Sequence, residues 1–274
     1  MKTGEVTSYV NCSFDYNGHN IAYLKTGKGK PVLLLHGFAE DSYVWRKQVD
    51  FLQSHCQLIV PDLPGSGRSD LLTDTHALSM EALAACVYGL LQHEGIDQCI
   101  VIGHSMGGYI ALALVEQYPA IISAFGFVHS TAYADNEEKK KNRQRGIEII
   151  GKNGGHAFIR ITTPNLFSKK FKEAHNDEIE DLIERGQSFT DKALQQYYFA
   201  MMNRPDRTKI LSGSGKSVLF IIGTEDVAAP LNDVLKQTHL PAVAYIHILQ
   251  NTGHMGMWES PADVNRFLQN FINQ

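Results

Sequence analysis

The sequence predicts an α/β protein built on a doubly wound, mostly parallel sheet with an inserted helical cap. Six short apolar runs recur along the chain, and helix-like stretches separate many of them. Such runs are typical of strands buried on both faces of a parallel sheet, and their alternation with helices predicts the doubly wound arrangement. The pattern is interrupted once, from residue 132 to residue 212, where only short amphipathic helical patterns occur.

The chain begins with a predicted hairpin and continues into the predicted sheet. Residues 12–27 alternate polar and apolar side chains around Asn17-Gly18, a dipeptide typical of two-residue hairpin turns. A last helix is expected to have Ser260 as its N-cap and Pro261 in its first position, with Asp263 reaching back as in a capping box. The six buried strands are expected at 31–37, 56–62, 98–105, 122–130, 217–226 and 242–249, and further helices at 42–54, 79–93, 107–118 and 231–238.

The interruption is interpreted as a helical cap that lies over one end of the sheet. A structureless loop of this length is uncommon in a compact domain. The core therefore comprises residues 1–131 and 213–274, and the cap comprises residues 132–212. A basic run in the cap, KKKNRQR, closely follows the acidic DNEE, so a solvated helix face explains it better than a nucleic-acid site.

Composition argues against several classes of function. The formal net charge of -4 does not suit a dedicated polyanion binder. No apolar run approaches the roughly 18 residues that span a bilayer, and the N-terminus lacks the apolar region of a signal peptide. We therefore expect a cytoplasmic protein that acts on a small molecule, with no nucleic-acid or membrane partner. The four cysteines have no C-x-x-C spacing and are interpreted as reduced thiols, with disulfides as the alternative: Cys12, Cys56, Cys86 and Cys99.

The motif GHSMG, Gly103 to Gly107, lies between a predicted strand and a predicted helix. In this context G-x-S-x-G indicates a nucleophile elbow, a tight turn that exposes a serine at the carboxyl edge of a sheet. Glycines allow the strand and the helix to approach closely, and the helix N-terminus supplies free N–H groups. Ser105 is the predicted nucleophile. The alternative is a glycine-rich packing turn in which Ser105 only caps the helix.

A serine hydroxyl needs a general base, and in this arrangement an acid and then a histidine follow the serine along the chain. His254 lies in a Gly-flanked loop just past the last predicted strand, where it can reach Ser105. The acid that orients His254 is predicted to be Asp226, which follows the preceding strand at the same edge. Glu225 is the second candidate, because adjacent side chains face opposite ways, and Asp135 is the third.

Acyl transfer also requires donors for the negative charge that develops on the carbonyl oxygen. Met106 follows the nucleophile, so its backbone N–H is one predicted donor of the oxyanion hole. The second is the N–H of Phe38, in the loop after the strand at 31–37, where Gly37 lets the backbone approach. The side chain of His36 is interpreted as a hydrogen-bonded core histidine.

Five segments, HGF, DLPGSGRSD, GHSMGG, GTEDVAAP and GHMGMWESP, together resemble the α/β-hydrolase superfamily over nearly the full chain. HGFAEDSYVWRKQVDFL is also similar to the corresponding segment of epoxide hydrolases and haloalkane dehalogenases. Both of those use an aspartate where this chain has Ser105, and dehalogenases usually have Trp where it has Met106. The resemblance therefore implies the α/β-hydrolase fold and a serine-bearing member, such as a carboxylesterase, a carbon–carbon bond hydrolase, a lactonase or a cofactor-free haloperoxidase.

These residues predict a carboxylesterase-like serine hydrolase that needs no metal or organic cofactor. Ser105, His254 and Asp226 would form the triad, and a small to medium apolar acyl group would be transferred to the serine. One alternative is a carbon–carbon bond hydrolase of diketone-type substrates, which uses the same triad. Others are a ligand receptor with slow turnover and a non-catalytic interaction module. Apolar character and position in the chain suggest a pocket formed by Phe38 and Met106 with Trp45, Phe158, Phe167, Tyr197 and Met201.

Overall fold

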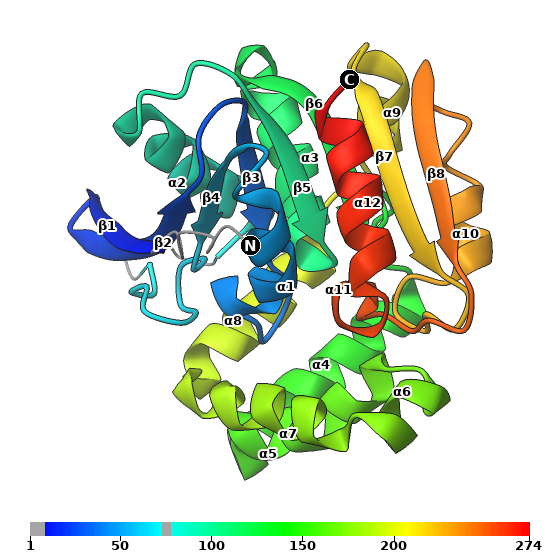
Figure 1. The fold of residues 1–274 in the computed structure, drawn as a ribbon. Coiled ribbons are helices and arrows are strands. Elements are labelled where there is room, and N and C mark those ends of the chain that lie inside the picture. The colour runs from blue at the N-terminus through cyan, green and yellow to red at the C-terminus, as the bar shows by residue number, and fades with distance from the viewer. Residues whose placement is uncertain (1–8, 73–77) are drawn as a thin grey trace, which may run out of the picture.

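The computed structural model describes residues 9–72 and 78–274, and a mostly parallel sheet runs through them. The strand order is β1-β2-β4-β3-β5-β6-β7-β8. β1 pairs antiparallel with β2 and β2 antiparallel with β4, whereas the remaining pairs are parallel. The predicted fold class is therefore confirmed (Figure 1). The strands are β1 (Val10–Tyr16), β2 (His19–Thr26), β3 (Pro31–Leu35), β4 (Gln57–Pro61), β5 (Cys99–His104), β6 (Ile122–Val128), β7 (Ser217–Gly223) and β8 (Val243–Leu249).

The predicted hairpin forms β1 and β2. Tyr16 is paired with His19, so Asn17 and Gly18 make a two-residue turn. Both turn residues have positive φ, 54° and 81°, which Asn tolerates and Gly adopts freely. This hairpin forms one edge of the sheet. The loops described below follow the parallel strands.

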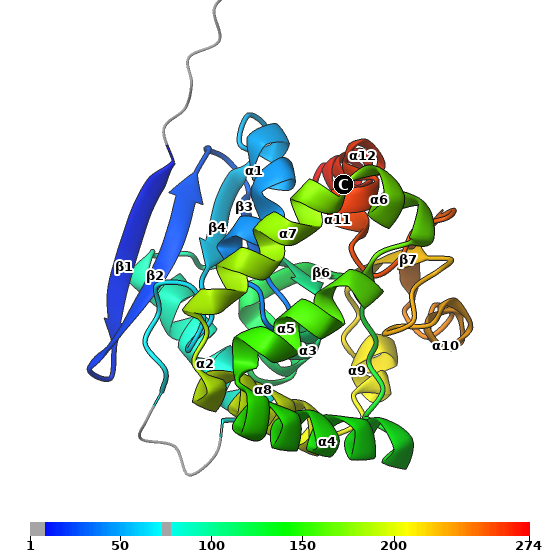
Figure 2. The same cartoon turned by 90° about the horizontal axis from the view of Figure 1, so that it is seen from below.

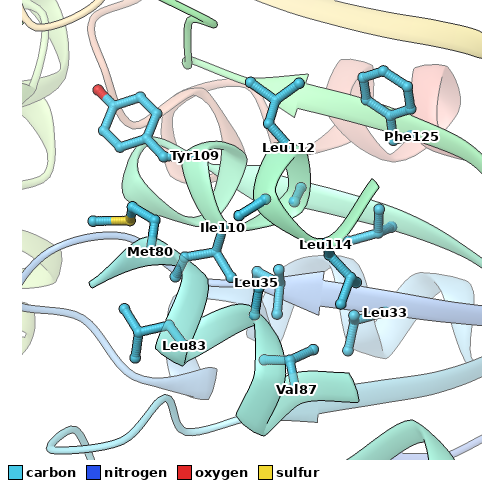
Figure 3. Close-up of a cluster of buried hydrophobic side chains, with 14 of the residues drawn as sticks. Leu33, Leu35, Met80, Leu83, Val87, Tyr109, Ile110, Leu112, Leu114 and Phe125 are labelled. Atoms are coloured by element: carbon cyan, nitrogen blue, oxygen red, sulfur yellow. The ribbon is translucent and has the colours of Figure 1, made fainter. Parts of the chain in front are cut away.

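Helices cover both faces of the sheet, and the alternation of side chains along each strand explains why. In β3, Leu33 and Leu35 belong to one core cluster, and Val32 and Leu34 belong to the other. Figure 3 shows the first cluster, where helices pack on Leu33 and Leu35. On that face lie α2 (Met80–His93), α3 (Met106–Gln117), α9 (Thr208–Gly213) and α10 (Leu231–Leu235), and on the other lie α1 (Arg46–Leu52), α11 (Gly256–Glu259) and α12 (Pro261–Ile272).

Five helices between β6 and β7 gather below the carboxyl ends of the parallel strands (Figures 1 and 2). α9 follows them in the chain but does not join them, because it contacts α3 and places Leu211 in the core of the sheet. The term cap is used below for α4 to α8. They are α4 (Glu137–Asn153), α5 (Gly155–Thr162), α6 (Lys169–Ala174), α7 (Asn176–Arg185) and α8 (Asp191–Asn203), and short 3-10 turns are η1 (Ser42–Trp45), η2 (Pro119–Ile121), η3 (Thr163–Leu166) and η4 (Gly186–Ser188).

Two local expectations are wrong. β8 is not buried on both faces, because it is the last strand of the sheet, and Ile246 and Ile248 remain 42% and 41% exposed. α12 does begin at Pro261, but the Ser260 side chain makes no capping hydrogen bond. Its hydroxyl instead lies 3.4 Å from the Thr252 hydroxyl. Over residues 9–72 and 78–274, none of the helices combines the length and apolar character needed to cross a membrane.

Candidate active site

Ser105 stands at the junction of β5 and α3 in a strained backbone conformation, with φ 49° and ψ -115°. Its N–H donates to Val128 O over 3.1 Å, so the turn is anchored on β6. A Cβ on Gly103 would lie 2.2 Å from the carbonyl carbon of Gly107, and one on Gly107 would lie 2.3 Å from Leu35 O. Only glycine fits either position. The turn therefore has the geometry of a nucleophile elbow.

Asp226 and His254 form a buried acid–imidazole pair next to this turn. Asp226 follows β7 and His254 follows β8, and they are 5% and 4% exposed. His254 Nδ1 lies 2.9 Å from each carboxylate oxygen of Asp226. The ring centroid of His254 is 4.8 Å from that of His104, the neighbour of Ser105. Within the part of the chain described here, no hydrogen bond joins the Ser105 hydroxyl to His254.

A second histidine, His129, binds the same carboxylate. Its Nδ1 lies 3.0 Å from Asp226 Oδ2, and its Nε2 accepts from the N–H of Gly256 over 3.2 Å. Because Nε2 is an acceptor, Nδ1 must carry the proton and donate it to Asp226. His129 has φ 54° and is fully buried, and burial lowers its pKa below the ordinary value. It is therefore held neutral as a fixed donor.

The electrostatics of the site favour an ionised Asp226. Burial alone would raise the pKa of this carboxyl, but His254 and the hydrogen bond from His129 outweigh it and hold the pKa far below the usual range. Burial opposes a charged His254, but the Asp226 carboxylate outweighs burial and raises the pKa of the imidazole above its ordinary value. The pair is therefore suited to a base that becomes a stabilised imidazolium.

The loop after β3 lies against the serine and presents free backbone donors. A Cβ on Gly37 would lie only 3.2 Å from Ser105 Cβ, so glycine permits this approach. Among the described residues, the N–H groups of Phe38 and Met106 have no protein acceptor. Met106 begins α3, whose N-terminus carries partial positive charge. These donors are the ones that the sequence predicts for an oxyanion hole.

Glu40 joins three segments of the site. Its Oε2 accepts from the N–H of Gly37 over 2.6 Å and lies 2.9 Å from His104 Nδ1. His104 Nε2 donates to the carbonyl of His254 over 3.1 Å. Burial opposes ionisation of Glu40, but His104 outweighs it and lowers the pKa of the carboxyl. Through His104, Glu40 thus ties the loop after β3 and the turn at Ser105 to the loop that holds His254.

A small cavity of about 50 Å³ lies between the sheet and the cap. It is next to the residues above, because Phe38 and Met255, which follows His254, both line it. Most of its wall is apolar, and Glu40, Asp41, Thr162, Thr163 and Arg185 add polar groups. The full lining is Phe38, Ala39, Glu40, Asp41, Val44, Thr162, Thr163, Leu166, Leu182, Arg185, Gly186, Phe189 and Met255.

Of the residues predicted to line a pocket, only Phe38 lines this cavity, and the assignment of the others stays a prediction. Trp45 and Phe167 pack in the cluster under α1, α11 and α12, and Phe158 packs in the cap. Tyr197 is fully buried and donates to the carbonyl of Pro64 over 2.7 Å, which anchors α8 to the core. Met201 is buried in the core cluster that includes α2 and α3.

The other candidate acids, Glu225 and Asp135, and the core histidine His36 differ in their exposure and in their hydrogen-bond or ion-pair partners. Glu225 is exposed, and its N–H donates to Thr252 O. Asp135 is buried but forms ion pairs with Arg143 and Arg204. The side chain of His36 is a hydrogen-bonded core group, as expected, because its Nε2 accepts from Leu63 N over 2.9 Å.

Sequence reasoning missed the contacts of His129 and Glu40. His129 lies at the end of the predicted strand at 122–130 and Glu40 lies in HGFAED, and neither local pattern indicates these contacts. With Asp226 and His254, His129 forms a group whose nitrogen and oxygen atoms lie within 4.8 Å of one another, a spacing that a metal ion could use. Both nitrogens of His129 are already engaged in hydrogen bonds, so the hydrogen bonds among these residues explain why they lie close together.

The fold and the nucleophile turn define an α/β hydrolase, and the chain belongs to the α/β-hydrolase superfamily. A family profile for the alpha/beta hydrolase fold matches residues 30–145. The chain is 26% identical to the uncharacterized hydrolase YugF of Bacillus subtilis, over 94% of this chain and 96% of that protein.

Two further likenesses cover nearly the whole length. The structure of a thermophilic esterase from Thermogutta terrifontis superposes with a TM-score of 0.88, at 27% identity, over 97% of this chain and 98% of that one. The 2-hydroxy-6-oxo-6-phenylhexa-2,4-dienoate hydrolase of Comamonas testosteroni is 23% identical over 95% of this chain and 93% of that protein.

Proposed function

We propose that this α/β hydrolase is a serine esterase that cleaves ester or related acyl bonds of a small apolar substrate. The observation that carries the proposal is the buried Asp226–His254 pair beside a strained serine turn. The resemblance to an esterase over nearly the full chain supports the same reaction class. The catalytic triad would then be Ser105, His254 and Asp226.

In the proposed mechanism the Ser105 hydroxyl oxygen attacks the substrate carbonyl, and its proton passes to His254 Nε2. Asp226 accepts a hydrogen bond from the N–H at Nδ1 and so keeps Nε2 free to act as the base. The N–H groups of Phe38 and Met106 bind the negative oxygen of the tetrahedral intermediate. His254 then protonates the leaving alcohol. In the second half of the reaction, His254 takes a proton from the water that attacks the acyl-enzyme carbonyl, and it returns this proton to the Ser105 oxygen as the carboxylic acid leaves.

The size of the cavity supports a short acyl group. One water needs roughly 10–15 Å³ of cavity, and this cavity has about 50 Å³. It therefore has room for a few heavy atoms when the cap is seated as here. We expect acetyl to butyryl esters to be better substrates than long-chain esters.

The test combines Ser105→Ala with a fluorophosphonate probe on the whole chain. We expect the probe to label Ser105, as mapped by mass spectrometry, and the variant to lose about a million-fold in kcat on a short aryl ester. Unchanged thermal unfolding of the variant would exclude a loss of fold. A variant that retains more than a few per cent of the activity would refute the assignment.

A carbon–carbon bond hydrolase is the second candidate, because one full-length relative carries a name of that kind. It would use the same serine, histidine and aspartate. Esters and diketone-type vinylogous acids of matched acyl length, assayed side by side, distinguish the two. A kcat/KM at least tenfold higher on the diketone series would favour the second candidate.

A further inference from the structure

The side chain of Phe38 packs with the cap, although its backbone belongs to the proposed oxyanion hole. Its ring stacks face to face on Tyr198 of α8, with centroids 4.1 Å apart and an interplanar angle of 6°. The loop after β3 is therefore shared between the sheet and the cap. Phe38 and Ala39 both pack against the hydrophobic cluster of the cap, which comprises Ile150, Phe158, Ile159, Phe189 and Leu194.

Tyr198 is itself held in place by its neighbours in the cap. Phe158 of α5 meets its ring edge-on, with centroids 5.8 Å apart and an angle of 90°. The guanidinium of Arg143, on α4, lies 5.4 Å from the ring centroid and is ion-paired with the buried Asp135. A Cβ on Gly146 of α4 would lie 2.5 Å from Tyr198 Cε2, so glycine leaves the space that the ring occupies.

We propose that Tyr198 is a positioning residue for the oxyanion hole, and that the cap acts on catalysis through its stack on Phe38. The inference rests on the proposed function, in which the Phe38 N–H binds the oxyanion. Ala39, the next residue, has φ 57°, a conformation that persists only where packing holds it. The stack on Phe38 supplies part of that packing.

Loss of the stack between Tyr198 and Phe38 should therefore lower kcat more than it changes KM. The oxyanion develops only in the transition state, so a misplaced donor weakens that state and leaves substrate binding nearly unchanged. An aromatic pair contributes enough for roughly a tenfold effect when it is removed. Removal of the tyrosine hydroxyl alone leaves the stack intact and should have little effect.

The experiment compares Tyr198→Leu with Tyr198→Phe and Gly146→Ala in the full chain. Fluorophosphonate titration counts the reactive serines, so kcat is expressed per active site and a loss of folded protein does not lower it. Each variant is assayed on a short aryl ester and with a trifluoromethyl ketone. Ser105 adds to the ketone carbonyl carbon, its proton passes to His254, and the carbonyl oxygen becomes the anion in the hole.

We expect Tyr198→Leu to lower kcat about tenfold and to change KM by less than about threefold. The affinity of the variant for the trifluoromethyl ketone should fall by the same factor as kcat. Gly146→Ala should shift both quantities in the same direction, because its methyl group would lie 2.5 Å from Tyr198 Cε2 and displace the ring. Tyr198→Phe should match the wild type within about twofold.

Two results would overturn this inference and leave the proposed function standing. One is a Tyr198→Leu variant with wild-type kcat per titrated site, and the other is a Tyr198→Phe variant as impaired as Tyr198→Leu. Failure of the proposed function is recognised separately, because the wild-type chain would then not react with the fluorophosphonate at Ser105. That result would overturn the oxyanion assignment and this inference with it.

Discussion

The substitution Asp226→Asn replaces one carboxylate oxygen by an NH2 group, and the structure favours one orientation of the new amide. Asp226 Oδ1 accepts from the N–H groups of Ala228 and Ala229, each at 2.9 Å. The carbonyl oxygen of Asn has to take this position, because NH2 cannot accept. The NH2 group then replaces Oδ2, which lies 2.9 Å from His254 Nδ1 and 3.0 Å from His129 Nδ1.

A donor at that position favours the wrong tautomer of His254. In the tautomer that accepts from this NH2 group, Nε2 carries the proton and cannot take that of Ser105, whereas Oδ1, also 2.9 Å from Nδ1, can still accept from the other tautomer. The negative charge that stabilises the imidazolium is lost as well. In triad enzymes this change costs about 10⁴-fold in kcat. The buried N–H of His129 also loses its acceptor, which costs about 1–3 kcal/mol and lowers Tm by roughly 2–10 °C.

The assay is hydrolysis of a short aryl ester by the purified variant, with thermal unfolding in parallel. Glu225→Gln is the matched control, because Glu225 is the adjacent acid, is exposed and binds Thr252 only through its backbone. We expect this control to retain activity within about threefold and an unchanged Tm. Equal losses in the two variants, or a larger loss at Glu225, would refute the assignment of the acid.

Three further predictions use the same geometry. The acidic limb of the kcat/KM profile should have its midpoint above pH 6.5, because Asp226 raises the pKa of His254 and the protonated ring cannot act as a base; a midpoint at or below that value contradicts it. Gly103→Ala should fail to fold, since its Cβ would lie 2.2 Å from a backbone carbon, and soluble yield with circular dichroism measures this. Phe189→Ala should raise kcat/KM for long relative to short acyl chains about tenfold, whereas Phe158→Ala, in the same cluster but not at the cavity, should lower Tm and leave that ratio unchanged.

Much of the fold follows from local pattern alone. Strand β3 alternates side chains between two cores, so its continuous apolar run could be recognised as a buried parallel strand. The Asn17-Gly18 turn and the glycines around Ser105 are requirements of the backbone, and they can be recognised in the sequence without information on packing. Parallel strands end at the same edge, which is why Ser105, Asp226 and His254 could be grouped before their contacts were known.

Local pattern fails where the outcome depends on a neighbour. Whether β8 is central or at the edge depends on what packs beside it, and its composition is the same in either case. The Ser260 side chain has the character of a cap, but in the folded chain its hydroxyl lies near Thr252 and does not bond the helix. Apolar character predicts the candidate pocket residues but does not distinguish a cavity wall from a core, so their assignment stays a prediction.

The sequence by itself therefore determined the class of fold, the turn that holds Ser105 and the order of the proposed triad, because each depends on short-range backbone chemistry and on the direction of parallel strands. Only the tertiary structure decided that His129 shares Asp226, that Glu40 ties three loops together and that Tyr198 stacks on Phe38. These are contacts between side chains far apart in the chain. Their geometry depends on the angles at which helices and strands pack, and no local periodicity encodes those angles.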